Sequence, residues 1–441
     1  MPRFICNVSL SRRHPNEFSL APLPIQPERL LRHPSFPLFW ASRIFSALGF
    51  QVASVAVGWL VYAKTGSAYA LGLVGLFQFL PMVALTFLVG HIADRFDRRR
   101  IVAACQFVEC LVLALLTFGD RDGKLDVAVL FAAVALLGAA RAFETPTMSA
   151  LLPALVPDAL LQKAIAVSSS AMQTATVVGP SLGGLLYATG ASVPLGVSAI
   201  CLAAACGAMA FIKMERTPPK REPISFQSIF SGVSFIRSRP IILGAISLDM
   251  FAVLLGGVTA LLPIFARDIL HTGPWGLGLL RSAPALGALS MSVLLAQMPL
   301  NRHVGIKMFA AVMVFGIATV IFSISTNFAI SLLALVILGA ADNVSVVIRI
   351  SLVQLSTPDA MRGRVNAVNS LFVGTSNQLG EFESGMLAGL LGVIPSGVIG
   401  GIGTILIALL WMRLFPALRK ISTLSNVTDD AAAGVVEATS T

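Results

Sequence analysis

The sequence predicts an all-α integral membrane protein whose twelve transmembrane helices form two six-helix pseudo-repeats. Three observations predict this fold class: an apolar composition, twelve long apolar segments and an internal repeat. Hydrophobic residues make up 56% of the 441 residues, and charged residues make up only 12%. In soluble domains about a quarter of the residues are charged, so this composition indicates a chain that lies mostly in lipid.

Twelve segments are long and apolar enough to cross a hydrocarbon core of about 30 Å as helices. These runs lack the two-residue alternation of barrel strands and are longer than such strands, which excludes a β-barrel. The predicted helices span residues 36–62, 68–90, 99–118, 127–147, 164–189, 193–213, 241–265, 276–298, 304–325, 328–350, 365–390 and 394–415.

An internal repeat relates the two halves of the chain. The motif Leu137–Arg141 returns 201 positions later as Leu338–Asp342, with its terminal charge inverted. A change of offset between matches is what one loop insertion produces. Duplicated membrane halves are typical of secondary transporters, in which the ligand site lies at the interface between the halves. Further matches are Leu71–Leu73 with Leu277–Leu279 at an offset of 206, and Gly184 with Gly385 at an offset of 201.

This repeat divides the chain into five segments. The polar stretch after the sixth helix is followed by an amphipathic pattern that predicts a surface helix. The small, polar and acidic C-terminal residues are expected to be disordered, and no cleavable signal peptide is evident at the N-terminus. The segments are a cytosolic lead-in (1–35), the N-terminal half (36–213), a cytoplasmic linker with an amphipathic helix (214–240), the C-terminal half (241–415) and a cytosolic tail (416–441).

The distribution of Lys and Arg predicts the orientation in the membrane. The even-numbered loops and the two ends hold 23 of the 31 basic residues, whereas the odd-numbered loops hold only Lys64, Arg121, Lys124 and Arg267. Under the positive-inside rule both termini and the linker lie in the cytoplasm, at the inner cell membrane. The net charge of +10 then follows from topology, and no nucleic-acid partner is expected.

No metal site, cofactor or enzymatic centre is expected. The five cysteines form no C-x-x-C pair and are interpreted as reduced packing thiols, and the five histidines are scattered. The stretch from Asp120 to Asp126 lacks the distal Glu of a calcium loop and is interpreted as a turn. The sequence contains no Walker A, H-E-x-x-H, G-x-S-x-G or D-D-x-x-D motif, so neither direct ATP drive nor enzymatic activity is expected.

The segment Gly90–Arg100 (GHIADRFDRRR) falls between the second and third predicted helices. It resembles the loop signature of the major facilitator superfamily, G-x-x-x-D-R-x-G-R-R, although Asp97 stands where the signature has Gly. The resemblance implies a cytoplasmic gate, because carboxylates at helix N-termini and Arg–carboxylate pairs can form reversible latches. The alternative is that the arginines only anchor topology at lipid headgroups. The gate residues are Gly90, Asp94, Arg95, Arg98 and Arg99.

A second motif, Gly179-Pro180-Ser181-Leu182-Gly183-Gly184, lies in the fifth predicted helix. It resembles the G-P-x-x-G-G antiporter motif of exporters in the same superfamily, and the resemblance implies export. Proline removes one helix hydrogen bond and glycine allows close helix contact, so the segment could form a bend or a tight seam. Ordinary helix packing is the alternative. The motif residues are Gly179, Pro180, Gly183 and Gly184.

Ionisable side chains at bilayer depth are costly and therefore mark functional hypotheses. Glu109 and Arg281 also lie in predicted helices, and Glu109 is expected to be structural because its helix is expected at the periphery. The candidates for the substrate and proton pathway are Arg43, Arg141, Glu144, Asp249, Asp342, Arg349, Glu381 and Glu383.

The repeat places Arg43 opposite Asp249 and Arg141 opposite Asp342. In the superfamily the first, fourth, seventh and tenth helices line a central cavity, and the resemblance implies the same here. Three interpretations stay open. The charges could form ion pairs between the halves that break and re-form, or static pairs within the bundle. Alternatively, Arg43 and Arg141 could bind an anionic substrate while a carboxylate carries a proton, since burial favours its neutral form. The proton candidates, in order, are Asp342, Glu381 and Glu383.

Further motifs narrow the resemblance to one branch of the superfamily. Val156-Pro157-Asp158 precedes the fifth helix, and Thr357–Val365 precedes the eleventh. With the motifs above, they make residues 30–415 similar to the enterobactin-exporter-like transmembrane secretion effectors. The resemblance implies a monomeric secondary transporter in the lipid bilayer that exports a siderophore, drug or similar amphipathic small molecule against proton influx by alternating access. The alternatives are uptake or lipid translocation by the same fold, and a non-transporting receptor or scaffold.

Overall fold

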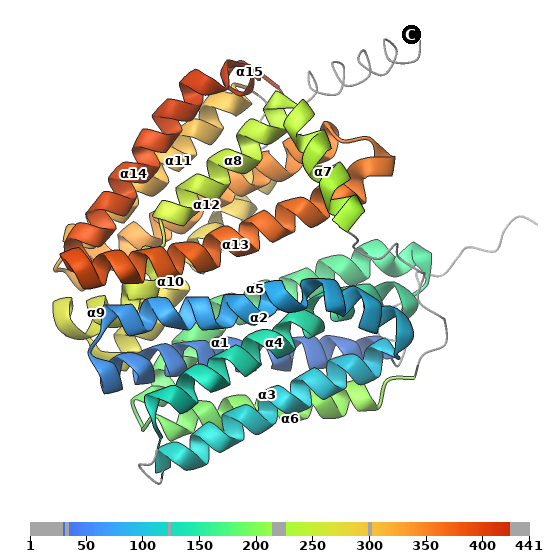
Figure 1. Cartoon of the computed structure of the whole chain (residues 1–441), viewed down its shortest axis with the longest axis vertical. Coiled ribbons are helices and arrows are strands. Elements are labelled where there is room, and N and C mark those ends of the chain that lie inside the picture. The colour runs from blue at the N-terminus through green and yellow to red at the C-terminus, as the bar shows by residue number, and fades with distance from the viewer. Residues whose placement is uncertain (1–29, 31–34, 122–124, 214–225, 299–301, 424–441) are drawn as a thin grey trace, which may run out of the picture.

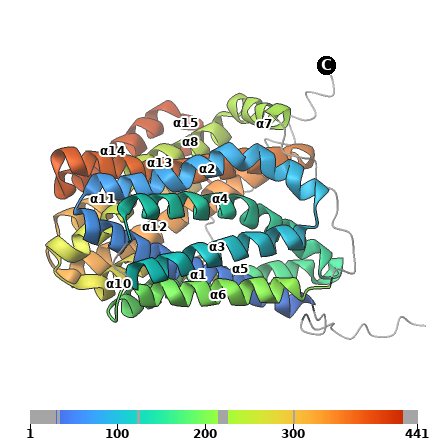
Figure 2. The same cartoon turned by 60° about the horizontal axis from the view of Figure 1, so that its bottom comes forward.

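The computed structural model describes residues 30, 35–121, 125–213, 226–298 and 302–423, and within these ranges it contains helices and no strands. The predicted lead-in up to residue 29, the first part of the linker (214–225) and the end of the tail (424–441) lie outside the described residues. The long helices gather into two bundles, one from each half of the chain (Figure 1). The two bundles run side by side, as a second view also shows (Figure 2).

Twelve long helices in the described chain correspond to the twelve predicted spans. The N-terminal bundle contains α1 (Ser35–Thr65), α2 (Ala68–Arg95), α3 (Arg98–Arg121), α4 (Val127–Leu151), α5 (Asp158–Tyr187) and α6 (Ser192–Ala210). The C-terminal bundle contains α8 (Pro240–Leu255), α10 (Gly273–Gln297), α11 (Val304–Ile324), α12 (Phe328–Leu355), α13 (Asp359–Leu391) and α14 (Val393–Leu414). Short helices are α7 (Phe226–Ser238), α9 (Leu262–Ile264) and α15 (Pro416–Arg419).

Ten of the spans in the described chain combine the length and apolar composition that crossing a membrane requires. The other two, α5 and α13, have 30 and 33 residues, which is about 45–50 Å of helix and long enough to cross. Helix ends follow local signals: Asp126 accepts a hydrogen bond from the N–H of Val127 at the start of α4, and Asn327 at the start of α12 accepts hydrogen bonds from the N–H groups of Ala329 and Ile330. The predicted all-α, twelve-helix fold class is confirmed.

One predicted helix, at 241–265, is not continuous. α8 ends at Leu255, and after Gly256 and Gly257 the chain continues as a 3₁₀ turn (Val258–Leu261), α9 and a π-helical turn (Phe265–Ile269). A Cβ atom on Gly257 would lie 2.8 Å from Ser384 Oγ, so only glycine lets α13 approach this closely. The apolar pattern carried no sign of this close contact, because it depends on a helix more than 100 residues away.

The outer surface of the bundles is apolar. Ile200 and Leu390 are each 70% exposed, and Phe118 is 63% exposed. Contiguous exposed apolar side chains are rare on soluble monomers and mark surfaces that meet lipid or another apolar partner. The interior cores are equally apolar, and one of them joins the end of α1 to the segment after α8. This distribution is what a membrane-embedded bundle requires.

The two bundles meet along a seam made of repeat-related glycines. Gly278 on α10 faces Gly184 on α5, and a Cβ on Gly278 would lie 3.0 Å from the Cα of Gly184. Gly72 on α2 faces Gly385 on α13, with the same 3.0 Å separation between a Cβ on Gly72 and the Cα of Gly385. The repeat relates Gly72 to Gly278 and Gly184 to Gly385. The seam is therefore pseudo-symmetric, and Ser181 and Ser282 add a hydrogen bond of 2.8 Å across it.

Adding a methyl group at this seam is expected to destabilise the protein. Gly278→Ala should lower the melting temperature in detergent, because overpacking a tight contact costs about 1–3 kcal/mol. Gly207→Ala is the matched control, since no atom lies within 4 Å of a Cβ at that position on α6. Equal melting temperatures for the two variants, measured by thermal unfolding, would contradict the close contact of α5 with α10.

Candidate functional site

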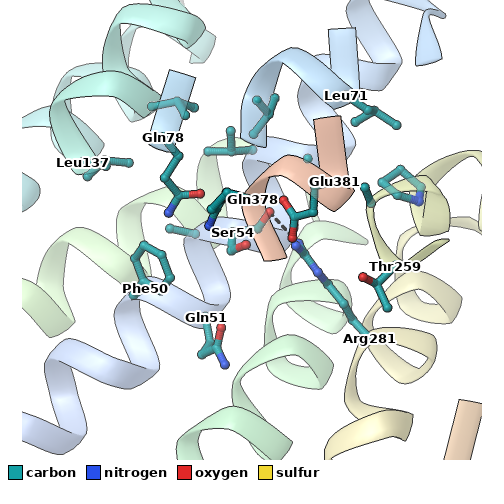
Figure 3. A pocket seen from close by; sticks show the side chains of 17 residues that line it. Phe50, Gln51, Ser54, Leu71, Gln78, Leu137, Thr259, Arg281, Gln378 and Glu381 are labelled. Carbon is teal, nitrogen blue, oxygen red and sulfur yellow. Dashed lines mark hydrogen bonds between the residues drawn. The ribbon is translucent and has the colours of Figure 1, made fainter. Parts of the chain in front are cut away.

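A cavity of about 290 Å³ lies between the two bundles. Its walls come from α1, α2 and α4 of the N-terminal bundle, and from α10, α13 and the turn after α8 of the C-terminal bundle. Figure 3 shows the side chains around it. Its polar lining residues are Gln51, Ser54, Gln78, Thr259, Arg281, Gln378 and Glu381. A pocket between two repeat halves is where ligands bind in transporters of this architecture.

One cation and one anion face each other in this cavity. The side chains of Arg281 on α10 and Glu381 on α13 point toward one another (Figure 3). Arg281 also donates a hydrogen bond from Nη1 to the backbone oxygen of Ser54 on α1, at 2.9 Å. Arg281 therefore joins the two bundles at the cavity. The charges of the lining balance, so the cavity favours neither an anionic nor a cationic ligand by net charge.

Three glutamine amides supply most of the remaining hydrogen-bonding capacity. Gln51, Gln78 and Gln378 come from α1, α2 and α13 and all line the cavity. Each amide can both donate and accept hydrogen bonds, and Phe50 adds an aromatic face beside them. None of these amides is among the pathway residues predicted from the sequence, which are all ionisable. A polar amide inside an apolar helix was the available signal.

Among the predicted pathway residues, Glu381 lines this cavity, and the others lie elsewhere. Arg43, Arg141 and Glu144 border a small cavity of about 40 Å³ in the N-terminal bundle. Asp249 and Asp342 border one of about 10 Å³ in the C-terminal bundle. Five of the charged candidates thus border two separate small cavities, one in each bundle.

In the N-terminal bundle, Arg141 pairs with two carboxylates. Its Nη1 lies 2.9 Å from Glu144 Oε2, and its Nε lies 3.3 Å from Glu109 Oε1 on α3. Arg141 also donates to the backbone oxygen of Ser46 at 2.9 Å and lies over the ring of Phe50 at 4.3 Å. This network ties α1, α3 and α4 together. Glu109, predicted to be a structural residue on a peripheral helix, is fully buried within this network.

In the C-terminal bundle, Arg349 pairs with Asp249 at 3.2 Å. Arg349 also donates from Nη1 to Asn369 Oδ1 on α13, at 2.8 Å. Asp249 and Arg349 are 5% and 3% exposed, so the pair is removed from solvent. Asp342 lines the adjoining small cavity with Ser345, whose buried hydroxyl has no hydrogen-bond partner among the described residues. Within the described residues, Asp342 itself makes no hydrogen bond or ion pair.

The ion pairs found here lie within one bundle. Arg141 contacts Glu109 and Glu144, and Asp342 lies in the C-terminal bundle beside Asp249. This conformation thus contains ion pairs within each bundle. Ion pairs between the two bundles stay a hypothesis about other conformations of the transport cycle. Glu383 is half-buried, and Ser384 Oγ lies 3.5 Å from its Oε2.

Part of the predicted gate loop binds its own bundle. Arg98 donates to the backbone oxygen of Ala150 at 3.3 Å, and Arg99 donates to that of Ile212 at 2.6 Å. Arg99 also bonds to both oxygens of Asp97, the residue that replaces the signature Gly. Arg95 is exposed, and the surroundings of Gly90 and of the Asp94 side chain lie outside what the structure describes.

This pairing lowers the pKa of the Asp97 carboxyl, chiefly because Arg99 donates hydrogen bonds to its charged form. The contribution of the pair to stability is therefore present above the ordinary pKa of Asp and is lost as the pH falls through the lowered value. The residue that departs from the family signature thus has a defined local partner.

The antiporter-like motif lies where α5 meets both bundles. A Cβ on Gly179 would lie 2.5 Å from Gln51 Cβ, and one on Gly183 would lie 3.0 Å from the backbone oxygen of Val52. Pro180 is inside α5, and its backbone oxygen would lie 2.7 Å from a Cβ on Gly278 of the other bundle. The motif therefore packs α5 against α1 on one side and α10 on the other, beside the central cavity.

The end of the molecule that carries α9 is further closed by polar contacts between the bundles. The hydroxyl of Tyr62 on α1 donates to Asp268 Oδ2, and the guanidinium of Arg267 lies 5.5 Å from the centre of the Tyr62 ring. The ribbons of the two bundles converge at this end and diverge toward the end that carries α7 (Figure 1). Within the described residues no cluster of three or more His, Cys, Asp or Glu side chains could hold a metal ion.

Comparison with known proteins identifies the family. The family model for transmembrane secretion effectors matches residues 25–435. The chain belongs to this family. Its curated relatives include the enterobactin exporter EntS of Citrobacter koseri, which is 25% identical over 426 residues, covering 91% of this chain and 97% of the relative. EntS of Escherichia coli O81 is 24% identical over 415 residues, covering 89% of this chain and 94% of the relative.

Solved structures support the fold. A bacterial homolog of the human lysosomal transporter Spinster, in an inward-facing and unoccupied conformation, has a TM-score of 0.69 at 13% identity and covers 92% of this chain and 99% of its own. The POT family transporter PepTSo has a TM-score of 0.68 at 12% identity, and the match covers 89% of this chain and 99% of PepTSo. At these identities the likeness concerns the fold. The protein is a multi-pass membrane transporter of the major facilitator type, and these relatives are transporters rather than enzymes.

Proposed function

We propose that this transporter exports a siderophore or a similar amphipathic small molecule from the cytoplasm, driven by proton influx. The observation that carries the proposal is the cavity of about 290 Å³ between the two repeat halves, lined from both of them. Its amides, hydroxyls and single Arg–Glu couple suit a ligand with many hydrogen-bonding groups and an aromatic part. The names of the curated relatives, enterobactin exporters, support export of this ligand class.

Alternating access is the proposed mechanism. The glycine seams of α5 with α10 and of α2 with α13 let the bundles roll against each other around the cavity, since small residues permit close, smooth helix contact. The contact between Tyr62 and Asp268 and the Arg281 hydrogen bond to Ser54 would break when the closed end opens. The positive-inside rule assigns the diverging end, with Arg98 and Arg99, to the cytoplasm. The conformation described is then inward-facing, with both termini cytoplasmic.

Proton coupling is assigned to the C-terminal bundle. Asp249 and Asp342 face one small cavity, and Arg349 is the cation paired there. Two carboxylates against one guanidinium leave one negative charge uncompensated in a buried site, which favours binding of one proton. Asp342 is the acceptor, because Asp249 already has its cation. Asp342 would carry a proton in one conformation and would be exposed to water in the other. This change would link proton movement to the rocking of the halves.

Transport assays in proteoliposomes test the proposal. Purified protein is reconstituted and offered catecholate siderophores, macrolides and lipophilic dyes, with and without an imposed pH gradient. We expect one class to move against its gradient when protons flow the opposite way. The cavity variant Arg281→Gln should lose this transport, whereas Arg413→Gln near the end of α14 should retain it. Substrate movement in the direction of proton flow would point to uptake, and movement of lipid alone would point to translocation.

A further inference from the structure

Glu109 on α3 is the buried carboxylate with the fewest donors in the N-terminal bundle network. Its side chain is 0% exposed, and neither of its oxygens accepts a hydrogen bond from a described residue. Arg141 is the cation paired with Glu109, and its Nε lies 3.3 Å from Glu109 Oε1. This Nε forms no hydrogen bond with any described residue. An ionised carboxylate with no donor in such a site is strongly unfavourable.

Glu144, on the neighbouring helix, is in the opposite situation. Its Oε1 accepts hydrogen bonds from Ser46 Oγ at 2.7 Å and from Gln106 Nε2 at 2.9 Å. Its Oε2 lies 2.9 Å from Arg141 Nη1. Two hydrogen bonds and one close ion pair on one carboxylate stabilise its ionised form. The donors of the network are therefore arranged around Glu144, and Glu109 receives almost none of them.

The two carboxyl groups also share one guanidinium, which contacts Glu144 through Nη1 and Glu109 through Nε of Arg141. Two ionised carboxylates at one guanidinium repel each other, and one bound proton removes this repulsion. The other charged group beside the network is Arg43 on α1, which borders the small cavity with Glu144, whereas Glu109 does not border it. The packed helices α3 and α6 also carry the free thiols Cys105, Cys110, Cys201 and Cys206, and the last of these donates to the Ala103 oxygen.

We propose that Glu109 carries a proton in this conformation and that Glu109, Arg141 and Glu144 form a proton-binding site of the N-terminal bundle, separate from Asp342. On release, the O–H bond of Glu109 breaks and the proton passes to a water molecule that enters the site; the cavity of about 40 Å³ that Arg141 and Glu144 border has room for one. The two carboxylates are then left on one guanidinium. Uptake reverses the step, and no other reactant is needed.

Infrared spectroscopy of the full-length protein in lipid tests this site without any transport assay. Labelling glutamate with ¹³C shifts the carboxyl bands of Glu and leaves those of Asp, which separates this site from Asp342. At neutral pH we expect one protonated-glutamate C=O band that is lost in Glu109→Gln. The band should persist in Glu383→Gln, a carboxylate of the other bundle. A band that survives in Glu109→Gln overturns the proposal.

Thermal stability provides a second readout. Gln resembles a protonated Glu in shape and can donate from its amide, so Glu109→Gln should melt at the wild-type temperature. Glu144→Gln should melt lower, because Ser46, Gln106 and Arg141 lose a charged acceptor. Failure of Glu109→Gln to fold, or a greater loss in Glu109→Gln than in Glu144→Gln, would show that Glu109 is the ionised group and contradict the proposal.

Discussion

Asp342→Asn is expected to abolish proton-driven export while leaving folding and membrane insertion intact. Asp342 borders a cavity of about 10 Å³ and makes no hydrogen bond or ion pair in the described structure, so the substitution removes no structural contact. Asn has nearly the same shape but cannot bind or release a proton at neutral pH. Export in inverted vesicles should fall to the rate measured without a pH gradient.

Asp126→Asn is the control for this experiment. Asp126 caps α4 at an exposed position, and Asn is an equally good N-cap, so the same chemical change should leave export unaltered. Normal proton-coupled export by Asp342→Asn would remove Asp342 from the mechanism and direct attention to Glu381 or Glu109. A protein that no longer folds would show that Asp342 has a structural partner.

Arg349→Met is expected to destabilise the protein by about 3–5 kcal/mol, because it leaves Asp249 buried without its cation. Replacing both partners, as in Asp249→Leu with Arg349→Met, should recover most of this loss, since an apolar pair leaves no buried charge. Thermal unfolding of the four proteins in detergent measures the coupling. Additive losses would mean that the 3.2 Å contact between these side chains contributes nothing to stability.

The sequence predicted the fold from signals that are local or periodic. Apolar length located every span, although α5 and α13 begin six residues before their predicted starts and α2 and α12 end five residues after their predicted ends, and Gly256 and Gly257 interrupt the span after α8. The repeat also showed which seam glycines are equivalent: Gly72 and Gly278 occupy matching positions in the two halves, and so do Gly184 and Gly385. Pseudo-symmetry then requires that both pairs meet.

The candidate site was less predictable, because it depends on how each helix is rotated. The repeat alignment placed Arg141 opposite Asp342, but the guanidinium of Arg141 turns toward Glu109 and Glu144 of its own bundle. Glu109 was predicted to be a structural residue on a peripheral helix, and one face of α3 packs inward and buries it. Gln78 and Gln378 carry no charge, so the cost of burying a charge in the membrane did not mark them as pathway residues. Sequence spacing fixes which residues share a helix face, and the packing of helices decides what that face meets.

The most direct test of the account is proton release by reconstituted protein when substrate is added. Proteoliposomes in weak buffer with a pH-sensitive dye would be mixed with the transported member of the siderophore and drug panel. An exporter that exchanges substrate for protons predicts a substrate-triggered, protonophore-sensitive pH change that is lost in Asp342→Asn. Transport of the same substrate with no accompanying proton movement would contradict the coupling at the centre of this account.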